Sequence, residues 1–196
     1  KRMRRLVDGM LNLSKLEAGE IKIHPSEFDF KQLVIDVLLS QEQRIDAKNL
    51  EILGLDTLDK CIVCADRDLL HQVVYNLCDN AIKYNHCGGN VNIRVHQTLY
   101  NAVLSVKDTG IGIPEESRER IFERFYRVDK SRSKEVGGTG LGLSIVKHAV
   151  MIHNGKIYLA YSASATGPEY CIGLMCADVN ADLLDINSWT KNKMPL

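Results

Sequence analysis

Four short polar or glycine-rich blocks follow one another between residues 76 and 142, and they constrain this chain more than any other feature of its sequence. They are residues 76–80 (Asn-Leu-Cys-Asp-Asn), 108–112 (Asp-Thr-Gly-Ile-Gly), 122–127 (Phe-Glu-Arg-Phe-Tyr-Arg) and 138–142 (Gly-Thr-Gly-Leu-Gly). Each block adjoins an apolar, periodic segment, an arrangement typical of ligand-binding loops held on a rigid scaffold. Together the four blocks predict a nucleotide site.

The composition fits one compact domain with a small appendage. The chain has 196 residues, 45% of them hydrophobic and 26% charged, and its 25 basic residues balance 25 acidic ones. Without a net charge no overall field holds the chain on nucleic acid or on an acidic membrane surface, so phosphate recognition has to be local. No apolar run is long enough to span a bilayer, and the basic start at residues 1–5 lacks the apolar stretch of a signal peptide. We therefore expect a soluble, cytosolic segment that contacts neither nucleic acid nor membrane.

Six cysteines raise the question of a metal site or a disulfide. Cys61 and Cys64 have a metal-like spacing, but they lie in a strand-like run, where residues three apart point to opposite faces. A further pair, Cys171 and Cys176, has no histidine at ligand spacing. We expect small core residues and free thiols.

The periodicity of apolar residues predicts a leading helix followed by an α/β domain. Met3, Leu6, Met10 and Leu13 alternate in steps of three and four, the pattern of a helix that packs on a partner helix, and Gly19 ends it. Helices are expected over 30–49, 66–81 (with Asp66 as the N-cap) and 141–153, and strands over 50–55, 61–65, 90–97, 101–107, 156–161 and 170–175. This order predicts an α+β two-layer sandwich, a mixed sheet packed on helices. The expected divisions are a helix over 1–19, a linker over 20–26, the main domain over 27–177 and a tail over 178–196.

The first block places two amides on one helix face. Asn76 and Asn80 are four residues apart, so both side chains project away from the leucine stripe and can face a cation or a phosphate. Magnesium takes oxygen ligands and keeps several waters, so one or two amide oxygens and substrate phosphates would complete its shell. Lys83 lies one turn further on, within reach of a phosphate, and Tyr84 offers a flat face beside it.

The second block follows an apolar strand. The carboxylate of Asp108 can accept a hydrogen bond from the exocyclic amino group of adenine, and Ile111 and Ile113 can contact the ring. Gly110 and Gly112 let a ligand approach the backbone closely.

The fourth block precedes a helix, so its backbone N–H groups and the helix dipole can hold phosphates. It is neither a P-loop, which requires a following Lys, nor a dinucleotide fingerprint, because Leu143 stands where the third glycine is needed. Phe122 and Phe125 can anchor a segment over 127–137 whose polar and glycine-rich composition suits a mobile lid.

The blocks resemble the N box, first glycine box, phenylalanine box and second glycine box of the ATP-binding domain of sensor histidine kinases, in the order that family has. The resemblance extends to residues 11–19 (Leu-Asn-Leu-Ser-Lys-Leu-Glu-Ala-Gly), which are similar to the end of that family's second dimerisation helix. It implies a Bergerat-type fold that binds ATP and magnesium, preceded by a partial dimerisation helix. It also implies a phosphoacceptor histidine helix in the parent chain or its dimer mate, a homodimeric full-length protein and a response regulator as partner.

The resemblance implies a role for each block. By analogy Asn76 and Asn80 bind magnesium, Lys83 and Arg127 meet the phosphates and, with Asn76, carry the catalysis. The residues implied in nucleotide binding are Asn76, Asn80, Lys83, Tyr84, Asp108, Gly110, Ile111, Gly112, Ile113, Phe125, Thr139, Gly140, Leu141 and Gly142. The segment 167–171 (Gly-Pro-Glu-Tyr-Cys) departs from the glycine-rich entry into the last strand that the family has.

Asn76 separates the branches of the wider superfamily. Gyrase-like and chaperone ATPases carry there a Glu that activates water, and an amide cannot act as a general base. Asn76 therefore favours transfer of the γ-phosphoryl group over hydrolysis. None of the six histidines lies in a His-Glu-x-x-Thr-Pro context, so the acceptor histidine is expected outside this segment. A non-catalytic, nucleotide-responsive interaction module and a gyrase- or chaperone-like ATPase stay open as alternatives.

Overall fold

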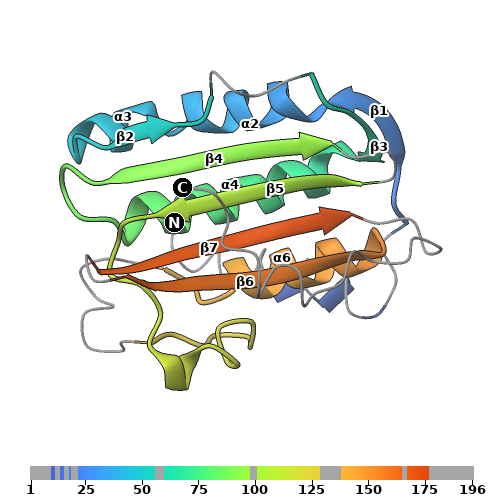
Figure 1. Cartoon of the computed structure of the whole chain (residues 1–196). Helices are drawn as coiled ribbons and strands as arrows, with labels where there is room; N and C mark the ends of the chain where they lie inside the picture. The colour runs from blue at the N-terminus through green and yellow to red at the C-terminus, as the bar shows by residue number, and fades with distance from the viewer. Residues whose placement is uncertain are drawn as a thin grey trace.

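A five-stranded sheet forms one of the two layers of the molecule (Figure 1). Its strands lie in the order β2 (Glu51–Leu53), β4 (Asn90–Gln97), β5 (Ala102–Asp108), β7 (Gly167–Cys176) and β6 (Gly155–Ser164). The β2 and β4 strands are parallel, and the other neighbours are antiparallel. The predicted mixed sheet is thereby confirmed, including a regular last strand that begins at Gly167 despite the unusual sequence there.

The computed structural model describes residues 10–11, 14–15, 18, 22–55, 60–97, 101–128, 138–164 and 167–176. The predicted lid over 127–137 falls almost wholly outside these residues, as do the predicted tail over 178–196 and most of the leading helix. Met10 and Leu11 are helical, and both side chains are exposed, as expected for a helix that packs on a partner.

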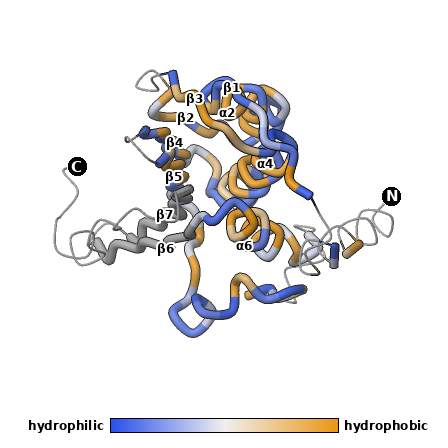
Figure 2. The backbone as a smooth tube through the Cα atoms, turned by 90° about the vertical axis from the view of Figure 1, so that its right-hand side faces the viewer, coloured by the Kyte–Doolittle hydropathy of each residue, from blue (hydrophilic) through white to orange (hydrophobic). Residues whose placement is uncertain are grey.

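The second layer consists of helices on one face of the sheet. Viewed edge-on, α2 (Phe30–Leu39), α4 (Arg67–Lys83) and α6 (Gly142–Ile152) all lie to the same side of the strands, and α4 stands between the other two (Figure 2). The core between the layers is built from alternating residues of β4 and β5 and from one stripe of α4: Val91, Ile93, Val95, Leu104, Val106, Leu70, Val73, Val74, Leu77, Cys78 and Ala81. Because this stripe faces the sheet, the polar face of α4 is left for other contacts.

A separate two-stranded sheet joins the start of the domain to α4. The β1 strand (Pro25–Asp29) pairs antiparallel with β3 (Ile62–Asp66), so β1 begins inside the segment expected as a linker. The last residue of each strand caps the next helix: Asp29 accepts a hydrogen bond from Lys31 N, and Asp66 accepts from Asp68 N and Leu69 N. The N-cap predicted at Asp66 is confirmed.

The prediction of one helix over 30–49 is wrong. The chain forms α2 and a second short helix, α3 (Glu42–Ala47), with a break between them. At the break, the hydroxyl of Ser40 donates to the carbonyl of Val37 at 2.6 Å, and Gln41 leaves the helical region with φ −112° and ψ 6°. A serine hydroxyl that bonds to the preceding turn competes with the helical hydrogen-bond ladder, and the apolar periodicity across the break concealed this.

The cysteines whose side chains are described are free thiols, as predicted. Cys61 is buried and Cys64 exposed, which confirms that they point to opposite faces of the strand. Burial raises the pKa of the Cys78 thiol to about 12, so this group stays protonated and belongs to the core. Within the described ranges, no helix has the length and apolar character needed to cross a membrane.

Candidate functional site

The polar face of α4 carries the first block. Asn76 and Asn80 both lie partly exposed, one turn apart, while Leu77 and Cys78 between them are buried. The predicted separation of the amide face from the leucine stripe is thus confirmed. The three amide hydrogen bonds that the Asp66 carboxylate accepts fix the start of this helix.

Asn76 faces the beginning of α6. A Cβ added at Gly142, the first residue of α6, would stand 3.4 Å from Asn76 Oδ1, so the start of α6 lies within van der Waals distance of this side chain. The Nδ2 group of Asn76 is buried and finds no hydrogen-bond partner among the described residues. A buried donor left unpaired costs about 1–3 kcal/mol, so this amide lacks an acceptor that a ligand could supply.

The C-terminal end of α4 contacts the second block. Tyr84 O accepts a hydrogen bond from Ile111 N at 3.1 Å, and Gly110 lies so close to this carbonyl that any Cβ would clash with it. The Lys83 ammonium lies 4.9 Å from the centroid of the Tyr84 ring, a cation–π distance. The first two blocks therefore meet through direct backbone contact.

Asp108 ends β5 at this meeting point. Its Oδ1 accepts a hydrogen bond from Gly110 N at 2.8 Å. Burial raises the pKa of the Asp108 carboxyl, and the bond from Gly110 and the nearby His86 only partly oppose that effect. Ile111 next to it is 58% exposed, although large aliphatic side chains are usually buried. An acceptor in a poorly solvated place beside an open apolar side chain is suited to bind the edge of a heterocyclic base.

The third and fourth blocks also meet. Phe125 N donates to Gly140 O at 3.0 Å, and both residues have a positive φ, 60° and 72°. A Cβ at Gly140 would lie 2.8 Å from the Phe125 carbonyl carbon, so the contact requires glycine. Phe125 is 47% exposed and does not fill the core.

Two cations meet at the start of the fourth block. Arg127 donates from a guanidinium nitrogen to Gly138 O at 2.8 Å. A Cβ added at Gly138 would stand 2.5 Å from Lys83 Nζ and 3.8 Å from the Arg127 guanidinium. Residues far apart in the sequence therefore bring two positive charges to one glycine, the arrangement expected of a phosphate-binding corner.

The remaining predicted residues lie around this centre. Thr139 Oγ1 accepts from Leu141 N at 3.3 Å, Gly112 has a φ of 71°, and Ile113 is partly exposed beside it. The side chain of Leu141 is buried against Ile145, so Leu141 can offer a ligand only its backbone.

Sequence reasoning missed a buried polar network behind the second block. Asn85, only 6% exposed, donates to Asn90 O at 2.8 Å and accepts from the hydroxyl of Thr109 at 3.2 Å, while Asn90 N donates to that hydroxyl at 2.9 Å. This network ties the segment that follows α4 to the start of β4 and fixes the backbone next to Asp108. The sequence held one signal of it, since Thr109 lies inside the second block.

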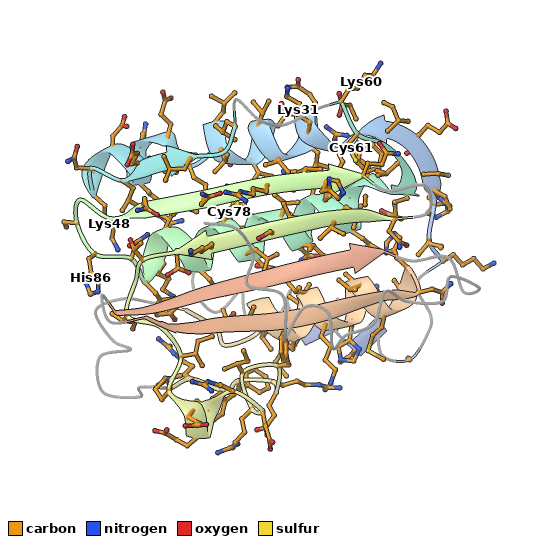
Figure 3. All side chains as sticks on the ribbon, viewed as in Figure 1. Lys31, Lys48, Lys60, Cys61, Cys78 and His86 are labelled. Carbon is orange, nitrogen blue, oxygen red and sulfur yellow. The ribbon has the colours of Figure 1, made fainter. Side chains whose placement is uncertain are left out.

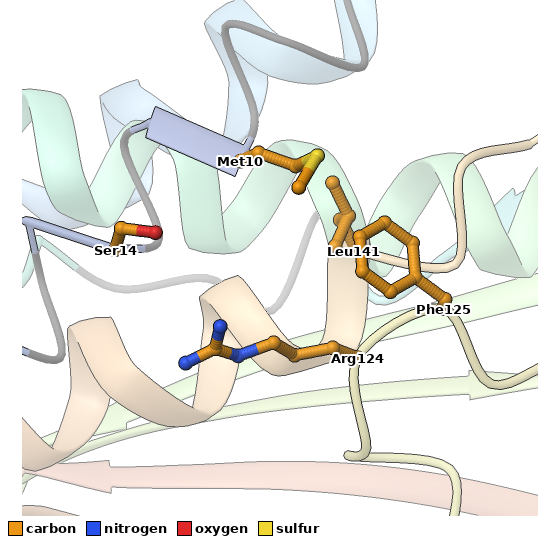
Figure 4. Close-up of a pocket in the computed structure, with 5 residues that line it drawn as sticks. All are labelled: Met10, Ser14, Arg124, Phe125 and Leu141. Carbon is orange, nitrogen blue, oxygen red and sulfur yellow. The ribbon is translucent and has the colours of Figure 1, made fainter.

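A small pocket opens on the other side of the phenylalanine block. It is lined by Met10, Ser14, Arg124, Phe125 and Leu141 (Figure 4). Met10 and Ser14 come from the leading helix, and neither Asp108 nor Lys83 lines the pocket. We therefore assign the pocket to the contact between the leading helix and the domain. Elsewhere in the described chain there is no cluster of three or more His, Cys, Asp or Glu residues that could hold a metal.

Comparison with known proteins agrees with this geometry. A family model described as "Histidine kinase-, DNA gyrase B-, and HSP90-like ATPase" matches residues 65–174. Sensor protein kinase WalK of Staphylococcus aureus is 39% identical over 179 residues, which cover 90% of this chain but only 42% of that kinase.

Solved structures of histidine kinases have the same fold. Full-length ShkA in complex with AMPPNP is 26% identical, with a TM-score of 0.74, over 90% of this chain and 36% of that one. Histidine kinase ThkA in complex with the response regulator protein TrrA is 25% identical, with a TM-score of 0.66, over 90% of this chain and 48% of that one.

Proposed function

The chain belongs to the family of histidine kinase-, DNA gyrase B- and HSP90-like ATPases and has the Bergerat-type fold of sensor histidine kinase catalytic domains, and from this premise we propose that it binds MgATP and transfers the γ-phosphoryl group to a histidine outside the chain. Since the chain spans less than half the length of WalK of S. aureus, the activity of the whole protein is part of this proposal.

The convergence of the four blocks carries the proposal. Lys83 and Arg127 meet at Gly138, and a triphosphate needs such a concentration of positive charge. At the other end of the site, Asp108 and Ile111 offer an acceptor and an apolar face to adenine. The complex of ShkA with AMPPNP supports an adenine nucleotide as the ligand of this fold.

The amides of α4 fit a magnesium-bound phosphate. Asn76 has an unpaired buried donor, and Asn80 lies one turn away on the same face. We propose that the oxygen of Asn80, with that of Asn76, ligates the ion. Magnesium, when bound, neutralises phosphate charge, and two neutral amides leave most of its ligand positions to phosphate and water.

The proposed reaction is phosphoryl transfer. Asn76 cannot accept a proton from water as the Glu of related ATPases does, so the site favours an acceptor that is itself a good nucleophile, the imidazole of a histidine. In this reaction Lys83 and Arg127 stabilise the charge on the transferred group, and Gly140 and Gly142 keep the backbone close to the phosphates. The gyrase- or chaperone-like ATPase is therefore the weaker alternative.

Partners follow from the same proposal. The phosphoacceptor helix belongs to the parent chain or its dimer mate. The full-length protein is a homodimer, and this segment of it lies in the cytoplasm. A response regulator accepts the phosphate. The complex of ThkA with TrrA supports the last point. A non-catalytic interaction module has no use for the paired cations at Gly138, which disfavours that alternative.

One assay tests the proposed function. The chain is mixed with γ-labelled ATP, magnesium and the separately expressed histidine-bearing helices of its parent protein. We expect acid-labile phosphohistidine on those helices and negligible release of inorganic phosphate. Rapid phosphate release without phosphohistidine would instead identify an ATPase, and nucleotide binding without either product would identify the interaction module.

A further inference from the structure

Lys48 holds the end of α4 from outside the nucleotide site. It is the C-cap residue of α3, and its Nζ donates to the carbonyl oxygens of Ile82, Lys83 and Asn85 at 3.0, 2.7 and 3.0 Å. Its own carbonyl accepts from Gly88 N at 2.9 Å. In Figure 3, Lys48 and His86 lie at the same end of the molecule, where α4 ends.

One ammonium satisfies three of the four carbonyls in this turn. The last carbonyls of a helix have no partner within the helix, and a cation there also interacts favourably with the helix dipole. The three hydrogens of an ammonium group match three acceptors, so the donor capacity of Lys48 is used completely. The fourth carbonyl, that of Tyr84, points the other way and accepts from Ile111 N.

This division of the carbonyls sets the geometry of the nucleotide site. Lys83, whose side chain we assign to the phosphates, and Tyr84, one of the residues implied in nucleotide binding, lie in the turn that Lys48 holds. The Tyr84 carbonyl orients Ile111, and through it the loop that carries Asp108 and Gly110. A rotation of the turn would therefore move residues of both blocks together.

We infer that Lys48 is a positioning residue that sets the affinity for the nucleotide without touching it, an inference that rests on the proposed function. Lys48 lies upstream of the segment that the family model matches, residues 65–174. Its partners are 34 to 37 residues away in the sequence. We expect the effect on binding, because Lys48 contacts only backbone carbonyls of this turn, that of Lys83 included, and no side chain that we assign to the phosphates.

The test compares Lys48→Met, Lys48→Arg and the control Lys60→Met, since Lys60 is exposed at the opposite end of the molecule (Figure 3). Calorimetric titration with MgATP gives the Kd, and phosphohistidine formation at saturating ATP gives the rate of transfer. We expect Lys48→Met to raise the Kd about tenfold and to leave the rate at saturation within about twofold of wild type. Lys48→Arg should give an intermediate Kd, about threefold raised, because a planar guanidinium cannot reach three converging carbonyls. Lys60→Met should bind as wild type does.

Hydrogen exchange supplies a second readout. In Lys48→Met, the amide of Ile111 should exchange faster without nucleotide, although Lys48 does not contact it. If Lys48→Met fails to fold, Lys48→Arg decides alone. A folded variant of either kind with wild-type affinity would overturn the inference and leave the proposed function standing, whereas failure of the wild-type chain to bind MgATP would overturn both.

Discussion

The carboxyl group of Asp108 lies largely buried at the end of β5, with one hydrogen bond from Gly110 N and a pKa raised by burial. A raised pKa means that the folded state favours the protonated form. The contribution of this group to stability is therefore full below its unfolded value, near 3.8, and is lost as the pH rises through the folded pKa. At neutral pH the buried carboxylate therefore destabilises the folded chain, and the binding of a base would offset this destabilisation.

We expect Asp108→Asn to separate the effect of Asp108 on stability from its effect on base binding. The amide keeps the oxygen that accepts from Gly110 but removes the buried charge, so the nucleotide-free protein should be at least as stable as wild type at pH 7. The amide also presents a donor to the amino group of adenine, and the Kd for ATP should rise about 10- to 100-fold. Thermal unfolding without ligand and calorimetric titration measure the two quantities. The same change at the exposed Asp46 is the control, and a clear fall in melting temperature for Asp108→Asn would contradict the argument.

Gly110 illustrates a glycine required by contact. We expect Gly110→Ala to destabilise the chain by about 1–3 kcal/mol, because its Cβ would meet the carbonyl of Tyr84 and overpacking against backbone has few ways to relax. Gly88→Ala is a suitable comparison, since Gly88 has a φ of 76° but open space around it, and should lose only about 1 kcal/mol. Urea unfolding of both variants measures the difference. Equal losses would show that the close approach of Gly110 to α4 is not rigid.

Residues that the sequence predicted for the site differ in kind from those that it missed. Asn76, Asp108 and Gly140 stand in recognisable blocks, and the structure brings these blocks together. Lys48 and Asn85 act through hydrogen bonds to backbone groups. Because every residue has such groups, the sequence contains no pattern that identifies the partners of these two side chains. Side chains whose partners are distant backbone groups become visible only when the fold is known.

At the scale of elements, α4 depends on its N-cap. The Asp66 carboxylate accepts hydrogen bonds from the amides of His24, Asp68 and Leu69, and Asp66 N donates to His153 Nε2 at 3.1 Å. Burial raises the pKa of this carboxyl, but the three amide hydrogen bonds and His153 outweigh burial and lower it. This single residue therefore links β1, the start of α4 and the end of α6.

We expect Asp66→Ala to lower the free energy of unfolding by about 1–2 kcal/mol at pH 7, the usual cost of losing an N-cap. A lowered folded pKa means that the carboxylate contributes stability above its unfolded value of about 3.8, and that this contribution is lost as the pH falls through the folded pKa. Wild type and variant should thus differ at pH 7 and converge as the pH falls below about 3.8 and through the lowered folded pKa. Urea titrations at several pH values test this, and a difference that persists unchanged in acid would assign the loss to packing.

The break between α2 and α3 shows a limit of periodicity. Leu39 continues the apolar pattern yet is 61% exposed, while Gln41, a polar residue, is 2% exposed. The apolar pattern could not reveal that Leu39 is exposed and Gln41 buried, because their burial depends on how the chain turns after Ser40. By contrast, the N-cap, the strands and α6 follow from local signals and lie within a few residues of their predicted bounds.

For the whole molecule, the position of α4 connects stability to function. Its apolar stripe packs on the sheet, and its polar face supplies Asn76, Asn80 and Lys83 to the site. The glycine block after β5 and the glycine block before α6 both meet the C-terminal half of this helix. Because the site is assembled from segments that only the folded core brings together, the nucleotide should bind the folded state and not the unfolded chain. Ligand binding of this kind stabilises the fold by mass action.

We therefore expect MgATP to raise the thermal stability of the chain. At about a hundred times the Kd, the gain in unfolding free energy should be about 2.7 kcal/mol, a rise in melting temperature of about 5–10 °C for a domain of this size. Chelating magnesium with EDTA should remove much of the gain, because Lys83 and Arg127 alone would then face the charge of the triphosphate.

GTP at the same concentration is the matched control: its ring carries a carbonyl where adenine has the amino group, and two acceptors cannot share a hydrogen bond at Asp108. Scanning calorimetry with each nucleotide, with and without EDTA, measures all of these shifts. Equal stabilisation by GTP and ATP would show that Asp108 does not recognise the base. A gain in stability that is insensitive to EDTA would show that magnesium does not take part in nucleotide binding.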